Sequence, residues 1–481
     1  MDGLLAALDW INTQMYSWLL IYLLAGVGIW FTVRTRAMQV RLVGRMVRTV
    51  AGSRHAEAGG ISPFQAFAIG LASRVGTGNI AGVAIAITLG GPGAVFWMWV
   101  IAAIGMATAF IEATLAQVFK VRWHDGTFRG GPAFYIWKGL KSWRWGATFA
   151  VALLFTFGIA FEMVQSNTIA ETLRTAHGVP TWITAVVLAV LSGAVILGGI
   201  KSVARVAEWV APLMALVYVL LSLVILVMNL DRLGFVFYEI VESAFGLNEA
   251  FAGTAGGMVA ALLNGVKRGL YSNEAGMGSA PNAASTATTI HPARQGLIQS
   301  AGVFVDTMLV CSATAFMILL SDESVYTPGM ELEGATLTQA AVAHHLGDWM
   351  TLPMTILIFT FAFSTIIGNY AYAEVNLDYL TGEAHERDLA LRITVIAAVV
   401  VGAFLKIDVV WSLADVSMGV MTLINLVAIL LLGKWAFAVL ADYEAGKGRS
   451  AFIAADSAHL PGVLDTDIWT HDNPTLTRNK A

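Results

Sequence analysis

The sequence predicts an all-α membrane protein with about eleven transmembrane helices. Of its 481 residues, 57% are hydrophobic and 12% are charged, whereas a soluble domain carries about 25% charged residues. The apolar residues lie in long stretches, and about 20 such residues suffice to cross a bilayer as a helix. A motif that occurs twice inside these stretches further predicts two related halves.

Hydropathy places the spans in chain order. The first ten residues lack the basic segment of a cleaved signal peptide, so we expect the first apolar stretch to be retained. The predicted spans are 14–33, 63–90, 93–120, 145–173, 181–199, 204–229, 248–278, 293–320, 350–380, 390–405 and 409–441.

Two segments lie outside these spans. The segment 34–58 is rich in arginine with Met and Val between, which is typical of an amphipathic helix on the inner membrane surface or of a simple topology anchor. The tail from about residue 443 shows no periodicity, so we expect it to be disordered.

Lys and Arg concentrate on one side of the predicted membrane, with seventeen on that side and three on the other. Because short loops rich in these residues stay in the cytoplasm, we expect the N-terminus outside and the tail inside. The seventeen are Arg34, Arg36, Arg41, Arg45, Arg48, Arg54, Lys120, Arg122, Arg129, Lys138, Lys141, Arg144, Lys201, Arg205, Arg294, Arg387 and Arg392, and the three are Arg174, Arg232 and Lys406.

The sequence argues against several other classes of protein. No basic cluster with interleaved aromatic residues supports nucleic-acid binding. The chain contains no GxxxxGK[ST] phosphate-binding loop and neither the HExxH nor the GxSxG motif. We therefore expect neither an ATP-driven pump nor an enzyme, and we expect no organic cofactor and no obligate protein partner.

The repeated motif reads Arg, four residues, Asn, any residue, Ala, Gly. It occurs as "RVGTGNIAG" at 74–82 and as "RGLYSNEAG" at 268–276. Five predicted spans start at each copy, and an odd number reverses the direction of the second unit, which makes an inverted repeat. The predicted divisions are an N-terminal helix and surface segment (1–58), a first five-helix repeat (59–229), a second repeat (230–442) and the tail (443–481).

The first copy interrupts an apolar stretch with Gly76, Thr77, Gly78 and Asn79. Each unmet backbone group in lipid costs several kcal/mol, so a break is tolerated where something polar meets these groups. The N-terminal end of a half-helix attracts an anion, and freed carbonyls bind a cation. A glycine kink that only serves helix packing would explain the glycines but not the neighbouring Arg74 and Asn79.

Four stretches carry a more specific signal: "ISPFQAFAIGLASRVGTGNIAGVAIAITLGGPGAVFWMWV" (61–100), "RGGPAFYIWKGL" (129–140), "MVQSNTIA" (163–170) and "NGVKRGLYSNEAGMGSAPNAAS" (264–285). They closely resemble the alanine or glycine:cation symporter family, and the resemblance extends over about residues 14–442. It implies a LeuT-type fold, with one extra helix before a five-plus-five core. It also implies sodium-driven uptake of alanine, glycine and serine across the plasma membrane of a bacterial-type cell.

Two positions depart from the family pattern. Glu162 stands where many members have a small residue or Asn, and Asn369 stands where some members have Trp. Both bear on the substrate more than on the fold. Glycine and alanine around the two breaks leave little room, which suits a small amino acid.

A zwitterionic amino acid needs donors for its carboxylate. The backbone N–H groups of Gly76, Thr77, Gly78 and Asn79 are the candidates, because helix ends with free N–H groups attract anions.

The ammonium group of the substrate needs acceptors. The candidates are Asn273 and the carbonyls near Ser272, with Gly276 allowing close approach of the backbone. The resemblance places Gln165 beside the substrate. The alternative for Gln165 is an interhelical hydrogen bond worth about 0.6 kcal/mol.

The coupling cation is expected to be sodium. In the LeuT-type fold, one sodium site joins carbonyls of the first broken helix to two adjacent hydroxyls on the eighth core span. Here the resemblance implies the carbonyls of Leu71, Ala72 and Val75 and the hydroxyls of Ser364 and Thr365. The alternative is that both hydroxyls bond the backbone of their own helix.

Charged residues inside spans need partners or water, because each costs about 2.5–3.5 kcal/mol at mid-depth. Arg74 and Arg268 are read as gate residues or as members of structural ion pairs. Glu162 is read as a competitor for the substrate ammonium, as a proton carrier in a proton-coupled transporter, or as a residue on a wet helix face. The set is Arg74, Glu112, Glu162, Lys267, Arg268, Glu274, Asp306, Glu374 and Asp415.

Proton coupling through Glu162 is therefore the main alternative to sodium coupling. A channel is a further alternative, although two interrupted halves argue for occlusion rather than for a continuous pore. Substrate counterflow distinguishes a carrier from a channel, because a channel shows none.

Overall fold

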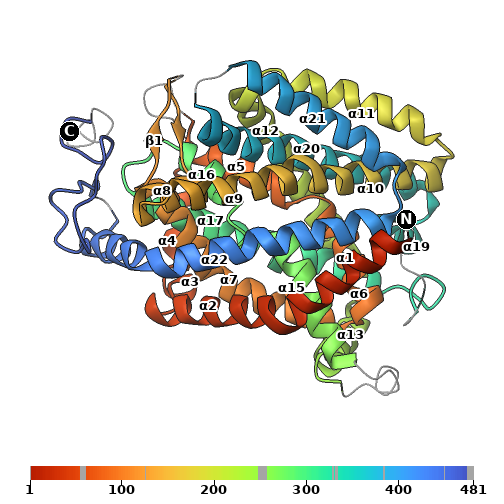
Figure 1. The fold of residues 1–481 in the computed structure, drawn as a ribbon. Coiled ribbons are helices and arrows are strands. Elements are labelled where there is room, and N and C mark those ends of the chain that lie inside the picture. The colour runs from red at the N-terminus through yellow and green to blue at the C-terminus, as the bar shows by residue number, and fades with distance from the viewer. Residues whose placement is uncertain are drawn as a thin grey trace.

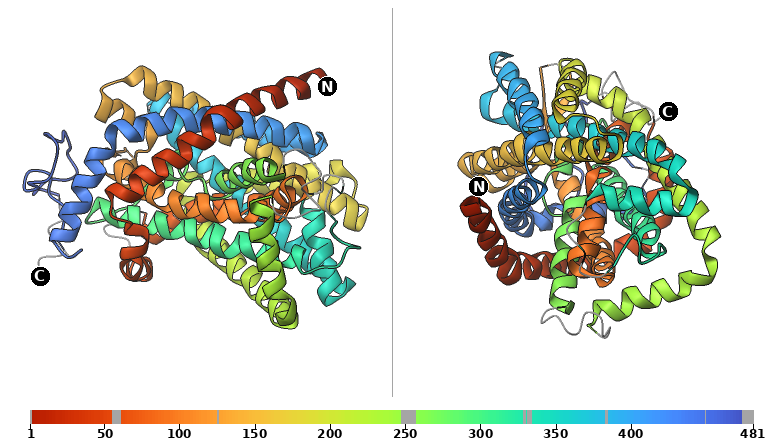
Figure 2. Two further views of the ribbon diagram at one scale, coloured as in Figure 1. Left: turned by 90° about the horizontal axis from the view of Figure 1, so that it is seen from below. Right: turned by 90° about the vertical axis from the view of Figure 1, so that its right-hand side faces the viewer.

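Long helices run between two ends of the molecule in the computed structural model (Figure 1). The structure describes residues 2–54, 61–124, 126–246, 257–327, 330, 334–382, 385–448 and 450–473. The N-terminal helix starts at one end of the bundle, and the described part of the C-terminal tail lies at the other end (Figures 1 and 2). We call the end that carries α3, α4 and the two strands the basic end, because Arg41, Arg45, Arg48 and Arg129 lie there.

The N-terminal part contains α1 (Asp2–Met15), the π-helical turn η1 (Tyr16–Leu20), α2 (Ile21–Arg34), α3 (Met38–Arg41) and α4 (Val43–Ala51). The first half continues with α5 (Pro63–Arg74), η2 (Gly78–Gly82), α6 (Val83–Gly90), α7 (Gly93–Val118), β1 (Val121–Arg122), β2 (Phe128–Arg129), α8 (Pro132–Leu140), α9 (Trp143–Phe155), η3 (Thr156–Ala160), α10 (Phe161–His177), α11 (Thr181–Ile196), α12 (Gly199–Met228) and α13 (Leu230–Ala244).

The second half contains α15 (Gly257–Asn273), α16 (Ala280–Thr286), α17 (Pro292–Val303), η4 (Phe304–Cys311), α18 (Ser312–Leu319), α19 (Ala335–Leu346), η5 (Asp348–Met350), α20 (Thr351–Thr381), α21 (His385–Phe404) and α22 (Ile407–Ala445). The beginning of the predicted span 248–278 lies outside the described residues.

The all-α membrane class is confirmed. In the described part of the chain, seven helices are long and apolar enough to cross a membrane, and the bent pair Pro63–Arg74 and Gly78–Gly90 makes an eighth. The count of eleven spans and the four divisions of the chain stay predictions.

The first helix begins earlier than hydropathy predicts. It starts at Asp2 rather than at residue 14, because α1 packs along α22. Asn12 donates to the carbonyl oxygen of Ser412 over 3.2 Å, and the Ser412 hydroxyl donates to Asp9 over 2.7 Å. Polar residues ahead of the apolar stretch therefore remain helical by bonding to a neighbouring helix.

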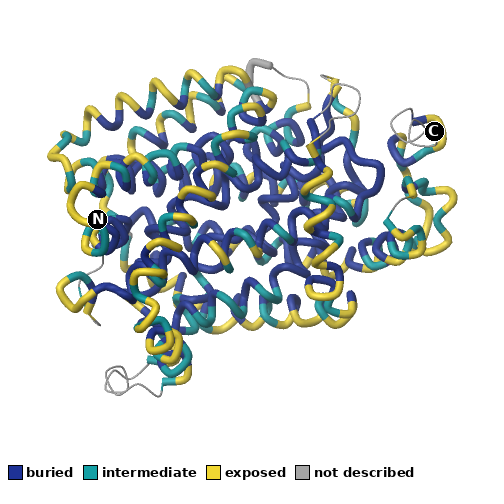
Figure 3. Tube along the Cα trace, turned by 180° about the vertical axis from the view of Figure 1, so that it is seen from behind, coloured by how far each residue is buried: buried dark blue, intermediate teal, exposed yellow. Residues whose placement is uncertain are grey.

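The core is built around α7, which packs against α15 and α17 in the middle of the bundle. Small residues let these helices approach closely: a Cβ on Gly269 would lie 2.6 Å from the Ile101 side chain, which forces tight contact. Buried residues follow the inner helices, and exposed residues follow the outer ones such as α11 (Figure 3).

The tail is ordered up to Asn473, so the expectation of disorder is wrong for residues 450–473. Phe452, Ile468 and Trp469 are buried. The Trp469 indole donates to the carbonyl of Gln117 over 3.0 Å, and the Phe452 amide donates to Ile290 over 2.9 Å. A few isolated apolar residues anchor this segment without any helical or strand periodicity, which is why the pattern gave no signal. Residues 474–481 lie outside the described part.

Candidate functional site

The first break separates α5 from η2 and α6, whose axes differ by 47°. α5 is well initiated, because Ser62 and Gln65 form a reciprocal capping box ahead of it. It ends where the Val75 amide donates to the carbonyl of Leu71 over 2.8 Å. The Gly76 amide then donates to the Asn79 side chain over 2.9 Å. Gly76, Thr77, Gly78 and Asn79 thus lie together on one buried turn.

The first break lies directly against the C-terminal end of α15. A Cβ on Gly78 would lie 3.2 Å from the Cα of Ser272 and 2.8 Å from the Tyr271 ring. The side-chain amide of Asn79 also donates to the Ser272 hydroxyl over 3.0 Å. The two interrupted spans therefore meet in the interior, where Asn79 and Ser272 are at most 1% exposed.

Asp306, on η4, joins the two broken spans. Its carboxylate accepts from Asn79 over 2.7 Å, from Ser272 over 2.6 Å and from Thr307 over 2.8 Å. Sequence reasoning counted Asp306 among the intramembrane charges but gave it no place in the site. A lone carboxylate in an apolar span must find donors, and two of its three donors, Asn79 and Ser272, belong to the two broken spans.

The proposed sodium ligands converge in part. Thr365 and Ser364 on α20 donate to the carbonyl of Ala72 over 3.0 and 3.5 Å. Both hydroxyls also donate to the carbonyl of Phe361 in their own helix. Their contacts therefore fit a cation site shared with the first broken helix as well as bonding within their own helix. The carbonyl of Leu71 accepts the Val75 amide.

Gly76 is the residue that lets α20 approach this point. A Cβ at Gly76 would collide with the Thr365 hydroxyl. Only glycine therefore leaves the hydroxyl its place between the break and α20.

The second break, from Glu274 to Ser279, is longer and is filled by the protein itself. Glu274, Gly276 and Gly278 have φ of 57°, 90° and 86°, in the left-handed region that favours glycine. The Glu274 carboxylate accepts from Ser73 over 2.8 Å and from Ser279 over 2.6 Å.

Two predicted substrate residues lie at this second break: Gly276 within it, and Asn273 at the end of α15. The Gly276 amide donates to Glu112 over 3.2 Å, and its carbonyl accepts from Asn425 over 2.9 Å. Asn273 accepts from the Ala275 amide over 3.0 Å. The structure brings Gly76, Thr77, Gly78, Asn79 and Ser272 together but surrounds Gly276 with residues of α7 and α22.

Gln165 reaches the site through Tyr271. Its side-chain amide donates to the Tyr271 hydroxyl over 3.1 Å, and its carbonyl oxygen is buried without a hydrogen-bond partner among the described residues. The Tyr271 ring lies 4.5 Å from the ring of Phe161 and 4.7 Å from that of Trp411. These three rings form an aromatic layer beside the first break.

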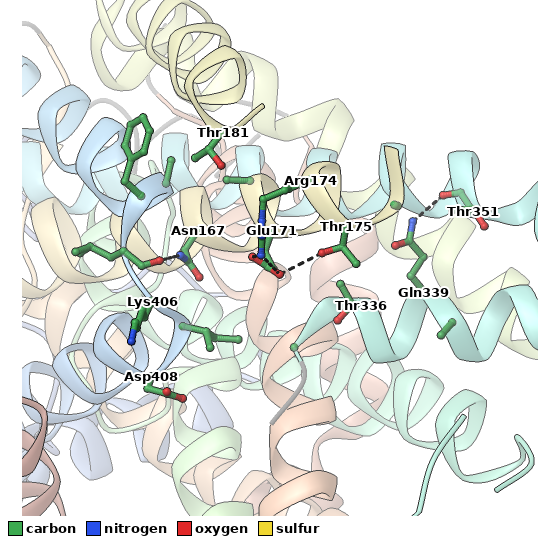
Figure 4. Close-up of a pocket in the computed structure, with 18 of the residues that line it drawn as sticks. Asn167, Glu171, Arg174, Thr175, Thr181, Thr336, Gln339, Thr351, Lys406 and Asp408 are labelled. Carbon is green, nitrogen blue, oxygen red and sulfur yellow. Dashed lines mark hydrogen bonds and ion pairs between the residues drawn. The ribbon is translucent and has the colours of Figure 1, made fainter. Parts of the chain in front are cut away.

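A cavity of about 850 Å³ opens at the end opposite the basic end, and polar residues of α10, α19 and α22 line it (Figure 4). Glu171 and Arg174 pair across its wall at 2.8 Å. Gly334 is one of the lining residues, and a Cβ on it would lie 3.5 Å from Ala81 of η2. Part of the cavity wall therefore lies next to the first broken helix.

Three charges predicted to need partners behave differently. Arg268 forms a buried ion pair with Asp415 and lies 4.5 Å above the Trp411 ring, which favours the structural interpretation. Arg74 forms no ion pair with the described residues; its guanidinium donates to the carbonyl of Gln299 over 3.4 Å. Both carboxylate oxygens of Glu162 are buried and lack a hydrogen-bond partner in the described part of the chain.

Most of the chain is similar to known proteins. The profile described as "Sodium:alanine symporter family" matches residues 1–452. The chain belongs to the sodium:alanine symporter family. It is 47% identical to the "Probable sodium/glutamine symporter GlnT" of Bacillus subtilis, over 98% of this chain and 97% of that protein.

Two further similarities agree with this assignment. The chain is 40% identical to the "Sodium/alanine symporter AgcS" of Methanococcus maripaludis, over 88% of this chain and 93% of that protein. The crystal structure of MhsT with L-phenylalanine matches 81% of this chain and 93% of its own with a TM-score of 0.59 at 15% identity. That structure confirms the LeuT-type fold. Membership makes the chain a multi-pass, sodium-coupled amino-acid symporter and not an enzyme.

Proposed function

We propose that this symporter imports small neutral amino acids (alanine, glycine and serine) with sodium into a bacterial-type cell. The observation that carries the proposal is the meeting of the Ala72 carbonyl with the Thr365 hydroxyl at 3.0 Å beside Gly76. An oxygen cluster next to a break is the kind of site that holds a small hard cation.

The substrate is proposed to lie at the first break. The backbone N–H groups of Thr77 and Gly78 would bind its carboxylate, because the Gly76 amide already donates to Asn79. Oxygens near Ser272 and Gln165 would bind its ammonium group. The contacts of Gly78 with Tyr271 and Ser272 leave little space for a side chain. Because Gly78 lies so close to Tyr271 and Ser272, we expect the substrate to be small.

The proposed orientation places the basic end in the cytoplasm and the 850 Å³ cavity outside. A sodium ion that crosses 100 mV contributes about 2.3 kcal/mol, which supports roughly 50-fold accumulation of substrate.

Uptake into proteoliposomes with an imposed sodium gradient tests the proposal. The substrates are glycine, D- and L-alanine, serine and glutamine, the last because of the name of the GlnT relative. We expect sodium to drive uptake of alanine, glycine or serine. Uptake of glutamine alone would overturn the small-substrate proposal, and uptake without counterflow would indicate a channel.

A proton-coupled carrier is the second candidate, favoured by the unpartnered buried carboxylate of Glu162. It predicts uptake driven by an imposed pH gradient in sodium-free buffer. The Glu162→Gln variant should abolish that uptake. If uptake needs sodium and Glu162→Gln leaves it unchanged, Glu162 has no part in coupling.

A further inference from the structure

A second cavity, of about 480 Å³, opens at the basic end between α4, the start of α17 and the end of α22. Figure 1 shows these three elements converging there. Four cationic side chains line it: Arg45, Arg48, Arg294 and Lys447. Among the described residues, no Asp or Glu lines it.

The nearest carboxylates on α22 are already engaged elsewhere. Glu444 pairs with Arg41 at 2.7 Å. Asp442 lies 3.4 Å from the ring nitrogen of His291. Within the described part of the chain, Arg45, Arg48 and Lys447 therefore form no ion pair with a carboxylate.

Arg45 provides the most specific evidence for a ligand. One terminal guanidinium nitrogen is buried and has no hydrogen-bond partner among the described residues. Its guanidinium lies 5.9 Å from the centre of the Tyr443 ring, which holds the side chain at the cavity wall. A planar guanidinium matches the geometry of phosphate oxygens. The Thr288 hydroxyl adds a neutral donor to the same wall.

An exposed apolar face lies beside the cavity on the same short helices. Leu42 and Met46 are buried, whereas Val40, Val43 and Val47 are 73%, 49% and 65% exposed. A short helix with a cationic side and an apolar side is typical of an element in the interfacial region of a membrane. The apolar face gives the chains of a lipid a place next to its headgroup.

We propose that this cavity binds the phosphodiester headgroup of an anionic phospholipid, whose acyl chains lie along Val40, Val43 and Val47. A free phosphate ion would satisfy the cations equally well, but it would leave the adjacent valine face without a function. The apolar face therefore favours the lipid.

The site also joins the two broken spans at the basic end. Ser53 and Pro63 line the cavity ahead of α5, and Thr288 lines it after α16. The Thr288 amide donates to the carbonyl of Ile61 over 2.9 Å, within a parallel bridge between Ile61 and Ala287. A bound headgroup would therefore contact both segments at once.

The test uses the full-length chain purified in a neutral detergent. Short-chain phosphatidylglycerol, phosphatidylcholine with the same acyl chains, and inorganic phosphate are titrated separately, and the melting temperature gives the apparent affinity. Arg45→Gln/Arg48→Gln removes two cavity cations. Arg36→Gln/Arg144→Gln removes two exposed cations that do not line the cavity.

We expect phosphatidylglycerol to raise the melting temperature of the unmodified chain far more than phosphatidylcholine does. The cavity variant should lose about thirtyfold in apparent affinity, because each of the two cations contributes about 1 kcal/mol near an anionic headgroup and about 1.4 kcal/mol corresponds to a tenfold change. The control variant should stay within about twofold of the unmodified chain. The single variant Arg48→Gln, at an exposed position, tests the site if the double variant fails to fold.

Three outcomes would overturn the proposal. Equal stabilisation by phosphatidylcholine would remove the role of headgroup charge. Equal stabilisation by inorganic phosphate would make the occupant a free anion. An equal loss of affinity in the control variant would reduce the effect to net charge.

Discussion

The two breaks share one sequence motif but are stabilised by different means. The first is three residues long, between Arg74 and Gly78, and its Gly76 amide is held by the Asn79 side chain of the same turn. The second needs three left-handed residues; Glu112 and Asn425 brace it from elsewhere in the chain, and Ser279 bonds Glu274 within the break. The difference suggests a division of labour: the second break is a fixed support, and the first is the part that meets ligands.

The largest expected effect concerns the ion pair of the second half. Asp415→Asn leaves Arg268 buried without its charged partner, so we expect a loss of about 3–5 kcal/mol in the free energy of unfolding. Arg74→Gln, at the equivalent position of the first half, breaks no ion pair among the described residues and should cost less. Denaturant titration in detergent measures both. Equal losses in the two variants would contradict the comparison.

Glycine-to-alanine substitutions should have different effects on stability at the two breaks. Gly278→Ala forces a side chain into φ of 86° and against Asn425 and Pro132, each 2.8 Å from the added Cβ. We expect a loss of about 2–4 kcal/mol in stability.

The matched change Gly76→Ala should keep the melting temperature within a few degrees, because the atom it displaces is the end of the Thr365 side chain. Sodium-driven uptake should fall at least about tenfold, since Thr365 leaves its place beside Ala72. If Gly76→Ala lowers the stability as much as Gly278→Ala does, the two breaks do not differ in the way proposed, as a ligand site and a fixed support.

Thr365→Val tests the ligand side of the comparison. Removal of a hydroxyl that binds a cation costs about 1.5–3 kcal/mol, so the sodium concentration for half-maximal uptake should rise by about ten- to hundredfold. Thr422→Val is the control, because the Thr422 hydroxyl is buried and donates to Met418 in its own helix. An unchanged sodium dependence in Thr365→Val would exclude this hydroxyl from the site.

The smallest effect is expected at Asn273. Asn273→Ala removes two neutral hydrogen bonds, one from the Ala275 amide and one to the Thr307 hydroxyl, each worth about 1 kcal/mol of stability, and should leave uptake within a few-fold. Asn79→Ala should abolish uptake, because Asn79 links Gly76, Ser272 and Asp306. Uptake assays on both variants decide whether Asn273 binds substrate, as the sequence predicted.

Much of the fold followed from the sequence because hydropathy and broken spans leave local signals. Gly76 and Gly78 marked the first break, and the repeated Arg and Asn located the second. The brace at the second break was not predictable, because Glu112 and Asn425 are brought to Gly276 from 164 and 149 residues away. Asp306 was missed for the same reason: its partners lie on other helices. The ordered tail depends on Phe452 and Trp469, which carry no periodic pattern.

The bridge between Ile61 and Ala287 has a mechanical consequence. It ties the entrance of α5 to the exit of α16. An outward movement of either segment therefore carries the other with it or breaks the hydrogen bond from Thr288 to Ile61.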